Sequence, residues 1–139
     1  MNYPIKYEQN PSSEDIQQLN NGIMENALQK RGMKPIEFFG FFVRNENHQI
    51  VAGCAGDLLY GCLYVGQLWV SASLRKKGYG TKLMELAENL AKERACNFMA
   101  VNTMDWEALD FYRSRGFFVE FERHGFDKNS IFYFLRKNL

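Results

Sequence analysis

The spacing of apolar and polar positions changes along the chain and predicts a succession of short elements. Residues 3–7 predict a first strand. A helix follows, because Ser12 stands three residues before Asp15, as in a capping box, and Gly32 is typical of a helix end. Between them, apolar side chains recur at helical spacing at Ile16, Leu19, Ile23, Ala27 and Leu28.

The middle of the chain predicts extended structure. Residues 36–44 are dense in Phe and lead into a polar turn at residues 45–47. A second strand is expected over residues 49–59, and Gly61 marks the next turn. A third strand is expected over residues 62–70. The three strands, joined by short turns, predict an antiparallel meander.

The rest of the chain alternates helices and strands. Residues 79–94 predict an amphipathic helix, because their apolar side chains fall on one face. Residues 97–103 predict a buried strand, and residues 106–115 predict a helix that a glycine closes. Residues 117–123 and 131–136 predict a final hairpin.

The order of these elements predicts an α/β (α+β) fold. A strand, a helix and a strand around residues 65–103 form a crossover unit, so these two strands are expected to be parallel neighbours in a mixed sheet. We expect a mostly antiparallel sheet of about seven strands with helices on both faces. A chain of 139 residues without a repeat or a linker predicts one domain over residues 1–139.

Charge and composition exclude several classes of partner. The 17 basic and 16 acidic side chains leave a net charge of +1, which gives no broad positive field for nucleic acid or an anionic membrane. No apolar run approaches the roughly 20 residues that span a bilayer, and the first residues lack the pattern of a signal peptide. We therefore expect a cytoplasmic protein in which any anion site is local.

The three cysteines, Cys54, Cys62 and Cys96, are scattered and form no C-x-x-C pair. This pattern fits neither a disulfide framework nor a zinc site, so we expect reduced thiols and no metal. A catalytic cysteine would need a base, and the two histidines, His48 and His124, lie in polar stretches far away in the sequence. A thiol nucleophile is thus an alternative that requires a contact made by the fold.

The most informative segment for function lies where the third predicted strand leads into the following helix. Residues 68–81 contain the end of the strand, a turn with Arg75, Lys76 and Lys77, and a helix start with two glycines. A helix N-terminus binds anions through its unpaired N–H groups, and glycine lets a phosphate approach the backbone. The segment matches neither a P-loop nor a dinucleotide fingerprint. The alternative is a solvated basic turn with a glycine cap.

A second segment, residues 108–117, ends a helix with Gly116 and carries Tyr112 one turn earlier. Ala108 and Tyr112 share a helix face, because they are four residues apart. Taken alone, a tyrosine here is typical of a core aromatic whose hydroxyl reaches water. The two segments carry more information together, in this order, than either does alone.

In these two segments the sequence resembles the GNAT superfamily of acyl-CoA-dependent N-acyltransferases. The family's cofactor motif, Q/R-x-x-G-x-G/A after a strand, is matched by Arg75, Gly78 and Gly80. Its later motif, A-x-x-F-Y-x-x-x-G-F, is matched by Ala108, Phe111, Tyr112, Gly116 and Phe117. The resemblance covers residues 65–118. Asp105 stands where the family often has Asn, and Ala72 stands where it often has Pro.

The resemblance implies a GNAT-type domain that uses acetyl-CoA (coenzyme A) as acyl donor. Backbone N–H groups from Lys76 to Thr81 would hold the pyrophosphate, and the strand Leu68–Val70 would pair with the pantetheine arm. An N–H near Val70 would polarise the thioester carbonyl, and Tyr112 would donate a hydrogen bond or a proton to the leaving thiolate. The implied cofactor-binding residues are Leu68, Trp69, Val70, Arg75, Lys76, Lys77, Gly78, Tyr79, Gly80, Thr81, Asp105 and Phe111. Tyr112 is the implied catalytic residue.

The sequence does not identify the group that accepts the proton of the attacking amine. The strand over residues 62–70 contains no Asp or Glu, and its Gln67 can orient a water but cannot hold a proton. The alternatives are a water relay or one of the side chains Glu37, Asp57, Glu46, His124 and Asp127.

The acceptor site is expected between the first-helix region and the final hairpin. Its expected walls are Arg31, Met33, Lys34 and Phe38 on one side and His124, Phe126, Asp127 and Lys128 on the other. A small amine, an amino acid, a peptide N-terminus and a lysine side chain all remain candidate acceptors. Most of the other Phe residues fit ordinary sheet core, and a few are expected to face the partner in a homodimer.

Together, these features predict an acetyl-CoA-dependent N-acetyltransferase that transfers an acetyl group directly to a primary amine. One alternative is a non-catalytic sensor or scaffold domain that binds acyl-CoA, in which Tyr112 is only a packing residue. Another is a nucleotide-phosphate binder that uses the same basic turn.

Overall fold

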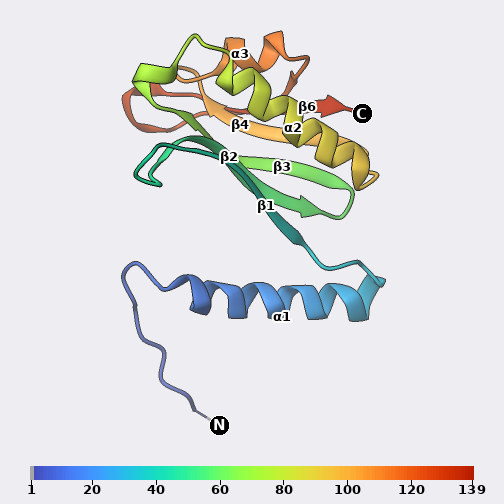
Figure 1. Cartoon of the computed structure of the whole chain (residues 1–139). Helices are drawn as coiled ribbons and strands as arrows, with labels where there is room; N and C mark the ends of the chain where they lie inside the picture. The colour runs from blue at the N-terminus through green and yellow to red at the C-terminus, as the bar shows by residue number, and fades with distance from the viewer. Residues whose placement is uncertain (1) are drawn as a thin grey trace. The chain divides into compact units, whose positions relative to one another are not determined.

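The structure is a computed structural model and describes residues 2–139. The chain divides into two compact units, one that ends at Pro35 and one that comprises Ile36–Leu139. The first unit holds one helix, and the second holds the sheet and the other helices, as labelled in Figure 1.

The helix of the first unit, α1, comprises Ser13–Arg31. The Ser12 side chain accepts a hydrogen bond of 3.1 Å from the Asp15 N–H, which confirms the predicted N-cap. Gly32 adopts the left-handed conformation, with a φ of 62°, and ends the helix as predicted. Local sequence signals are therefore sufficient to set both ends of α1.

The predicted first strand, residues 3–7, is wrong. The structure has no strand among these residues, and the side chains of Tyr3, Ile5 and Tyr7 are exposed. A strand is stable when its backbone groups pair with a neighbour and one of its faces is buried. Neither condition is met within the described part of this unit. The sheet accordingly has six strands, not the seven expected.

The second unit is built on a six-stranded sheet in the order β1-β2-β3-β4-β6-β5. Its strands are β1 (Glu37–Arg44), β2 (Ile50–Leu59), β3 (Cys62–Val70), β4 (Phe98–Met104), β5 (Phe118–Arg123) and β6 (Phe132–Asn138). Its helices are α2 (Tyr79–Glu93) and α3 (Leu109–Ser114), with short 3-10 turns η1 (Ala72–Leu74) and η2 (Asp127–Asn129). These bounds follow the predicted elements closely, except in α3.

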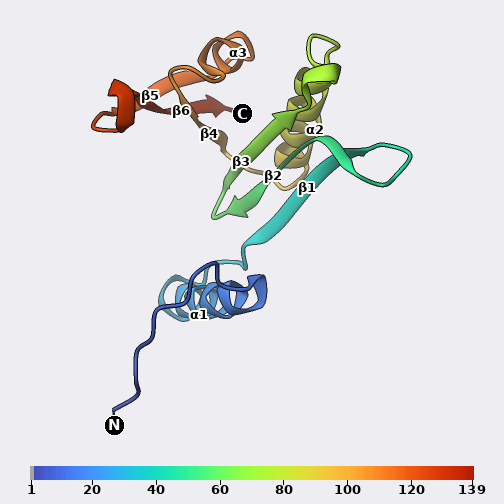
Figure 2. The ribbon, with the colours of Figure 1, turned by 90° about the vertical axis from the view of Figure 1, so that its left-hand side faces the viewer.

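The connections agree with the predicted topology. Strands β1, β2 and β3 form an antiparallel meander, and β3 pairs with β4 in parallel. Strand β6 lies between β4 and β5 and is antiparallel to both. Figure 2 shows the meander and the β5–β6 hairpin on the two sides of β4. The crossover from β3 through α2 to β4 is the unit that the sequence predicted.

The core of this unit lies between the sheet and helices α2 and α3. The sheet side of the core includes Leu63, Val65, Met99, Val101 and Leu135. Helix α2 buries Leu83, Met84, Ala87 and Ala91, and α3 adds Tyr112 to the same cluster. Each fully buried apolar side chain contributes about 1.5–3 kcal/mol. This packing holds α2 and α3 over one face of the sheet (Figure 1).

Helix α3 is shorter than the predicted helix over residues 106–115. The residues before it form a turn instead, in which the Glu107 N–H donates to the Met104 carbonyl at 3.1 Å. The Ala108 N–H donates to the Thr103 hydroxyl at 3.0 Å. In a helix over residues 106–115 these two N–H groups would lie in the first turn, where they have no acceptor within the helix. The turn gives each of them an acceptor, and the helix starts only after it.

An ion pair between α2 and β6 supports a stability prediction. The Glu88 carboxylate accepts a 2.5 Å hydrogen bond from Lys137, and Lys92 lies 3.1 Å from its other oxygen. Lys137, and then Lys92, hold the pKa of Glu88 below its ordinary value of 4.5. We expect Glu88→Gln to lower the free energy of unfolding by about 1 kcal/mol at neutral pH.

The sign of the pH dependence follows from the lowered pKa of Glu88. The ion pair stabilises the fold fully above the ordinary value of 4.5, and its contribution is lost as the pH falls through the lower folded-state pKa. Urea unfolding of both proteins across the acid range measures this difference. Glu93→Gln is the control, because Glu93 is 71% exposed in its pair with Arg94. A difference for Glu88→Gln that persists in strong acid contradicts the prediction.

Candidate active site

The parallel strands β3 and β4 pair over part of their length only. Their ladder ends at Val65 and Val101, whereas β3 continues to Val70 and β4 to Met104. Figure 2 shows the two strands running apart beyond the paired part. The backbone edge of β3 after Val65 is therefore not covered by β4 and can pair with an extended ligand.

A β-bulge lies where the two strands separate. Gly56 of β2 pairs with Val65, and Ala55 pairs with Gln67, so Gly66 is the extra residue on β3. A bulge bends its strand and increases the local twist, and bulges are frequent beside active sites. The bulge thus accounts for the change in direction of β3 at this point.

The end of β3 directs two N–H groups toward the opening. The Ser71 N–H donates to the Val51 carbonyl of β2 at 2.9 Å, which marks these residues as a hydrogen-bonded pair. Bonded and non-bonded pairs alternate along an antiparallel ladder, so Leu68 and Val70 direct their N–H groups away from β2. Both N–H groups are available to a ligand on the side of β3 where β4 no longer pairs with it.

Two cavities follow this open edge. The strand cavity, of about 560 Å³, is lined by Leu68, Trp69, Val70, Arg75, Gly80, Trp106, Glu107, Ala108 and Phe111. The loop cavity, of about 270 Å³, is lined by Val70, Leu74, Arg75, Lys76, Gly78, Tyr79, Gly80, Thr81 and Phe111. The two cavities adjoin, because four residues line both of them.

The loop cavity ends at the start of α2, where the geometry favours an anion. Gly78, the N-cap, has a φ of 87°, and Lys76 also has a positive φ, of 62°. The first-turn N–H groups of a helix have no acceptor within the helix, and no acidic residue stands in the first turn of α2. A Cβ on Gly80 would lie 3.5 Å from the Phe111 ring. The loop therefore combines exposed N–H groups with positive charge.

The predicted cofactor-binding residues gather at these two cavities. All of them line one or both cavities except Lys77 and Asp105. Asp105 instead binds the chain before β6: its N–H donates to the Ile131 carbonyl at 2.9 Å, and its carboxylate accepts from the Ile131 N–H at 3.1 Å. Arg75 donates from Nε to the Val70 carbonyl at 3.0 Å and so closes the end of β3.

A third cavity, the tyrosine cavity, has a volume of about 360 Å³. It is lined by Tyr64, Val65, Gly66, Gln67, Leu68, Trp69, Asn102, Thr103, Glu107, Ala108, Tyr112 and Phe132. It shares Leu68, Trp69, Glu107 and Ala108 with the strand cavity. Within it, Asn102 Nδ2 donates to the Tyr64 hydroxyl at 2.8 Å. The two cavities thus meet where β3 leaves β4.

Tyr112 lines the tyrosine cavity from a buried position. Its side chain is 5% exposed, and its ring makes edge contacts with Phe111 and Phe117 at centroid distances of 5.4 Å and 5.7 Å. Burial, with smaller contributions from Cys54, Glu107 and Tyr64, raises the pKa of Tyr112 far above its ordinary value. The phenol therefore stays protonated at neutral pH and carries an O–H that can donate a hydrogen bond.

None of the five side chains considered as the base lines the tyrosine cavity. Glu37 accepts two hydrogen bonds from Arg94, at 3.0 Å and 3.1 Å, and this partner lowers the Glu37 pKa. His124 lies 3.3 Å from Glu122. Burial raises the pKa of Asp57, whose β3 neighbour is Tyr64. Gln67 does line the cavity, in agreement with a role in orienting water.

Sequence reasoning did not single out two residues that line the strand cavity, Trp106 and Glu107. Both belong to the turn before α3, where a regular helix was expected. Within the family's later motif they precede the matched Ala108, so no motif position marked them. The Trp106 indole donates to the Ser130 hydroxyl at 3.0 Å. Only the turn geometry brings their side chains to the cavities.

The cysteines are free thiols in the structure. Burial raises the pKa of Cys54 and of Cys62 to about 11, so these thiols stay protonated and are poor nucleophiles. Among residues 2–139, no group of three His, Cys, Asp or Glu side chains is arranged to hold a metal ion. No described helix is both long enough and apolar enough to cross a membrane.

Comparison with known families identifies the family of the chain. The family model described as Acetyltransferase (GNAT) family matches residues 11–117. The chain belongs to the GNAT acetyltransferase family. The resemblance inferred from the two sequence motifs is thereby confirmed.

Curated GNAT relatives match part of the chain. An acetyltransferase from Agrobacterium fabrum is 35% identical over 75 residues, which cover 54% of this chain and 55% of the relative. A blasticidin-S acetyltransferase from Streptomyces morookaense is 32% identical over 85 residues, which cover 60% of this chain and 62% of the relative. The matched part thus spans a little over half of each relative.

Solved structures share the fold. A putative acetyltransferase from Agrobacterium tumefaciens superposes with a TM-score of 0.84 and 24% identity, covering 100% of both chains. A putative streptothricin acetyltransferase from Bacillus anthracis, solved in complex with acetyl coenzyme A, has a TM-score of 0.65 and 18% identity. That match covers 76% of this chain and 64% of the other. The expected GNAT fold is confirmed, with six strands.

Proposed function

We propose that this protein is an acetyl-CoA-dependent N-acetyltransferase that transfers an acetyl group directly to a primary amine. The observation that carries the proposal is the separation of β3 from β4. It leaves the N–H groups of Leu68 and Val70 facing a cavity that runs to the basic loop and start of α2. A buried, protonated Tyr112 lies at the other end of the same opening.

The residues of the two donor-side cavities fit coenzyme A. The open edge of β3 suits the extended, amide-containing pantetheine arm, because a β-strand edge pairs with such a chain through its backbone. The N–H groups between Lys76 and Thr81, with the charges of Arg75, Lys76 and Lys77, suit the pyrophosphate. Bound acetyl-CoA would supply an acetyl group activated as a thioester.

Two groups of the chain support transfer from that thioester. The Val70 N–H donates a hydrogen bond to an oxygen that gains negative charge, which lowers the barrier. The Tyr112 phenol donates its proton to the departing sulfur, which avoids the release of a free thiolate. Both groups are held by elements that pack on the common core.

A turnover assay tests this function. Acetyl-CoA is mixed with the protein and a panel of primary amines that includes blasticidin S, and free thiol and acetylated product are measured together. We expect one acetylated amine for each CoA released. Tight CoA binding without transfer to any amine supports the sensor or scaffold alternative. Displacement of CoA by ATP or NAD at comparable affinity supports the nucleotide-binding alternative and contradicts pairing of β3 with pantetheine.

Several expectations from the sequence belong to this proposal. We assign residues 1–139 to one N-acetyltransferase domain in the cytoplasm, without a nucleic-acid or membrane partner and without a metal. The roles of Lys77 and Asp105 toward the cofactor stay predictions, as does the acceptor wall around Arg31, Met33 and Lys34. Exposed sheet phenylalanines such as Phe121, which is 54% exposed, are assigned to the contact with a second copy in a homodimer.

A further inference from the structure

Glu107 lines both the strand cavity and the tyrosine cavity. The turn before α3 places it there, and the side chain folds back so that Oε1 accepts from the Met104 N–H at 3.3 Å. Among the described residues, this is the one side-chain hydrogen bond that the Glu107 carboxylate makes. One carboxylate oxygen is therefore used to orient the side chain, and the other is available to a ligand.

The ionisable side chains that line the tyrosine cavity include a carboxylate and no cation. Among its lining residues, Glu107 is the one carboxylate, and no Lys, Arg or His lines the cavity. The negative charge of Glu107 acts on Tyr112, because it contributes to the raised pKa of Tyr112. A cavity with a single negative charge and no compensating cation attracts a cationic ligand.

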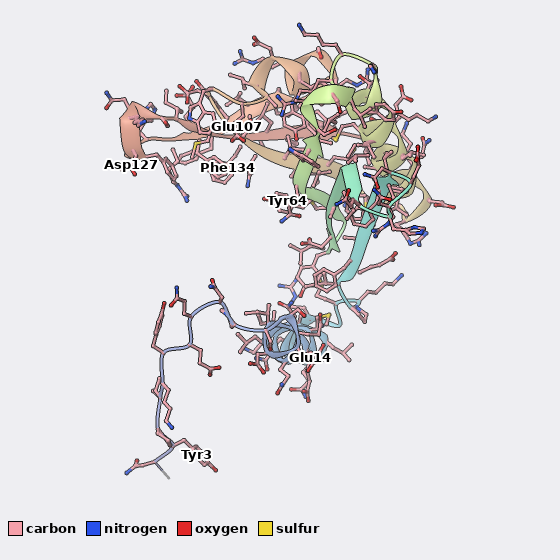
Figure 3. The ribbon with its side chains drawn as sticks, turned by 60° about the vertical axis from the view of Figure 1, so that its left-hand side comes forward. Tyr3, Glu14, Tyr64, Glu107, Asp127 and Phe134 are labelled. Carbon is pink, nitrogen blue, oxygen red and sulfur yellow. The ribbon has the colours of Figure 1, made fainter. Side chains whose placement is uncertain are left out.

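Aromatic faces complete the cavity wall. Tyr64, Trp69, Tyr112 and Phe132 line it together with Glu107, and aromatic faces attract cations as well as apolar stems. The Tyr64 hydroxyl accepts from Asn102, which holds this ring in place on β3. Figure 3 labels Tyr64 and Glu107, which come from β3 and from the turn between β4 and α3. The two residues bound the cavity from a strand and from a turn.

We propose that the tyrosine cavity takes a cationic primary amine with an aromatic or apolar stem, and that Glu107 binds its ammonium group. Glu107 is a positioning and selecting residue: it holds the amine between the aromatic faces, beside the end of β3 and the Tyr112 hydroxyl. This inference rests on the proposed N-acetyltransferase function. The bound ammonium loses a proton to water before its nitrogen attacks the thioester carbonyl. The amide product is uncharged, so it no longer pairs with Glu107 and is released more readily.

Binding without transfer tests this inference independently of turnover. Phenethylamine, which is cationic at neutral pH, and its uncharged analogue 2-phenylethanol are titrated into the full chain by calorimetry, without acetyl-CoA. We expect phenethylamine to bind about tenfold more tightly than the alcohol, the effect of one charge-assisted hydrogen bond. Glu107→Gln is expected to abolish this preference, because the amide keeps the shape of the side chain but carries no charge.

The control variant is Asp110→Asn, which removes the same charge three residues away, at an exposed position that lines none of the three cavities. We expect it to keep the preference for the amine. Equal binding of amine and alcohol by the unmodified protein overturns the proposal, and so does an unchanged preference in Glu107→Gln. If the protein binds phenethylamine selectively yet transfers no acetyl group, the proposed enzyme function fails while the cation site stands.

Discussion

Tyr112→Phe is expected to lower kcat for acetyl transfer about a hundredfold, which is within the range for a single proton donor. The substitution removes one oxygen atom and keeps the ring that contacts Phe111 and Phe117. Burial holds the pKa of the Tyr112 phenol far above neutrality, so the hydroxyl is a donor and not a base. The rate of thiol release at saturating acetyl-CoA and amine measures this effect.

The control for Tyr112→Phe is Tyr133→Phe. Tyr133 is a partly buried tyrosine on β6 that packs against the core and lines none of the three cavities. We expect this variant to keep kcat within about twofold, as is usual for a change away from the reacting atoms. Both variants are also compared by thermal unfolding. Normal turnover in a folded Tyr112→Phe protein would contradict the assignment of Tyr112 as the acid.

Gly80→Asp is expected to weaken CoA binding by about a hundredfold, which corresponds to the loss of the anion contacts at the start of α2. A Cβ fits at this position, because it would meet the Phe111 ring at 3.5 Å, an ordinary contact distance. The new carboxylate, however, lies in the first turn of α2, where it competes with the phosphates for the same N–H groups. Calorimetric titration with CoA measures the loss.

The stability of the Gly80→Asp variant separates this effect from misfolding. A carboxylate in the first turn of a helix is stabilising, and a glycine there is not. We therefore expect the variant to be at least as stable as the unmodified protein while it loses CoA affinity. Gly80→Ala is the matched control for added volume, and it should lose much less affinity. If folded Gly80→Asp binds CoA normally, the phosphates bind elsewhere.

The sequence pattern predicted most of the fold, because interactions between residues close in the sequence determine where most helices begin and end. Ser12 and Gly32 set the ends of α1 through hydrogen bonds within a few residues. The strand expected at residues 3–7 failed for the opposite reason: strands depend on a distant neighbour, and the pattern of five residues does not show whether one exists. The turn before α3 likewise depends on the Thr103 hydroxyl, which a helical pattern does not reveal.

The candidate site was predicted in part. Motif positions led to Tyr112 and to most residues of the strand and loop cavities, because these motifs describe a backbone geometry. The separation of β3 from β4 was not derivable from periodicity, since it depends on a bulge at Gly66 and on where a parallel ladder ends. Glu107 was not found for a related reason: it reaches the cavities through an irregular turn. Glu107, the side chain proposed to bind the ammonium group, was therefore not predictable from the sequence.

Hydrogen–deuterium exchange with and without acetyl-CoA tests the central claim most directly. The claim is that the donor lies along the open edge of β3 and ends at the start of α2. We predict that saturating acetyl-CoA slows exchange in peptides that cover Leu68, Val70 and residues 76–81, and that ATP does not protect the Leu68–Val70 part. Slowed exchange in another part of the chain, with residues 68–81 unchanged, would contradict the account.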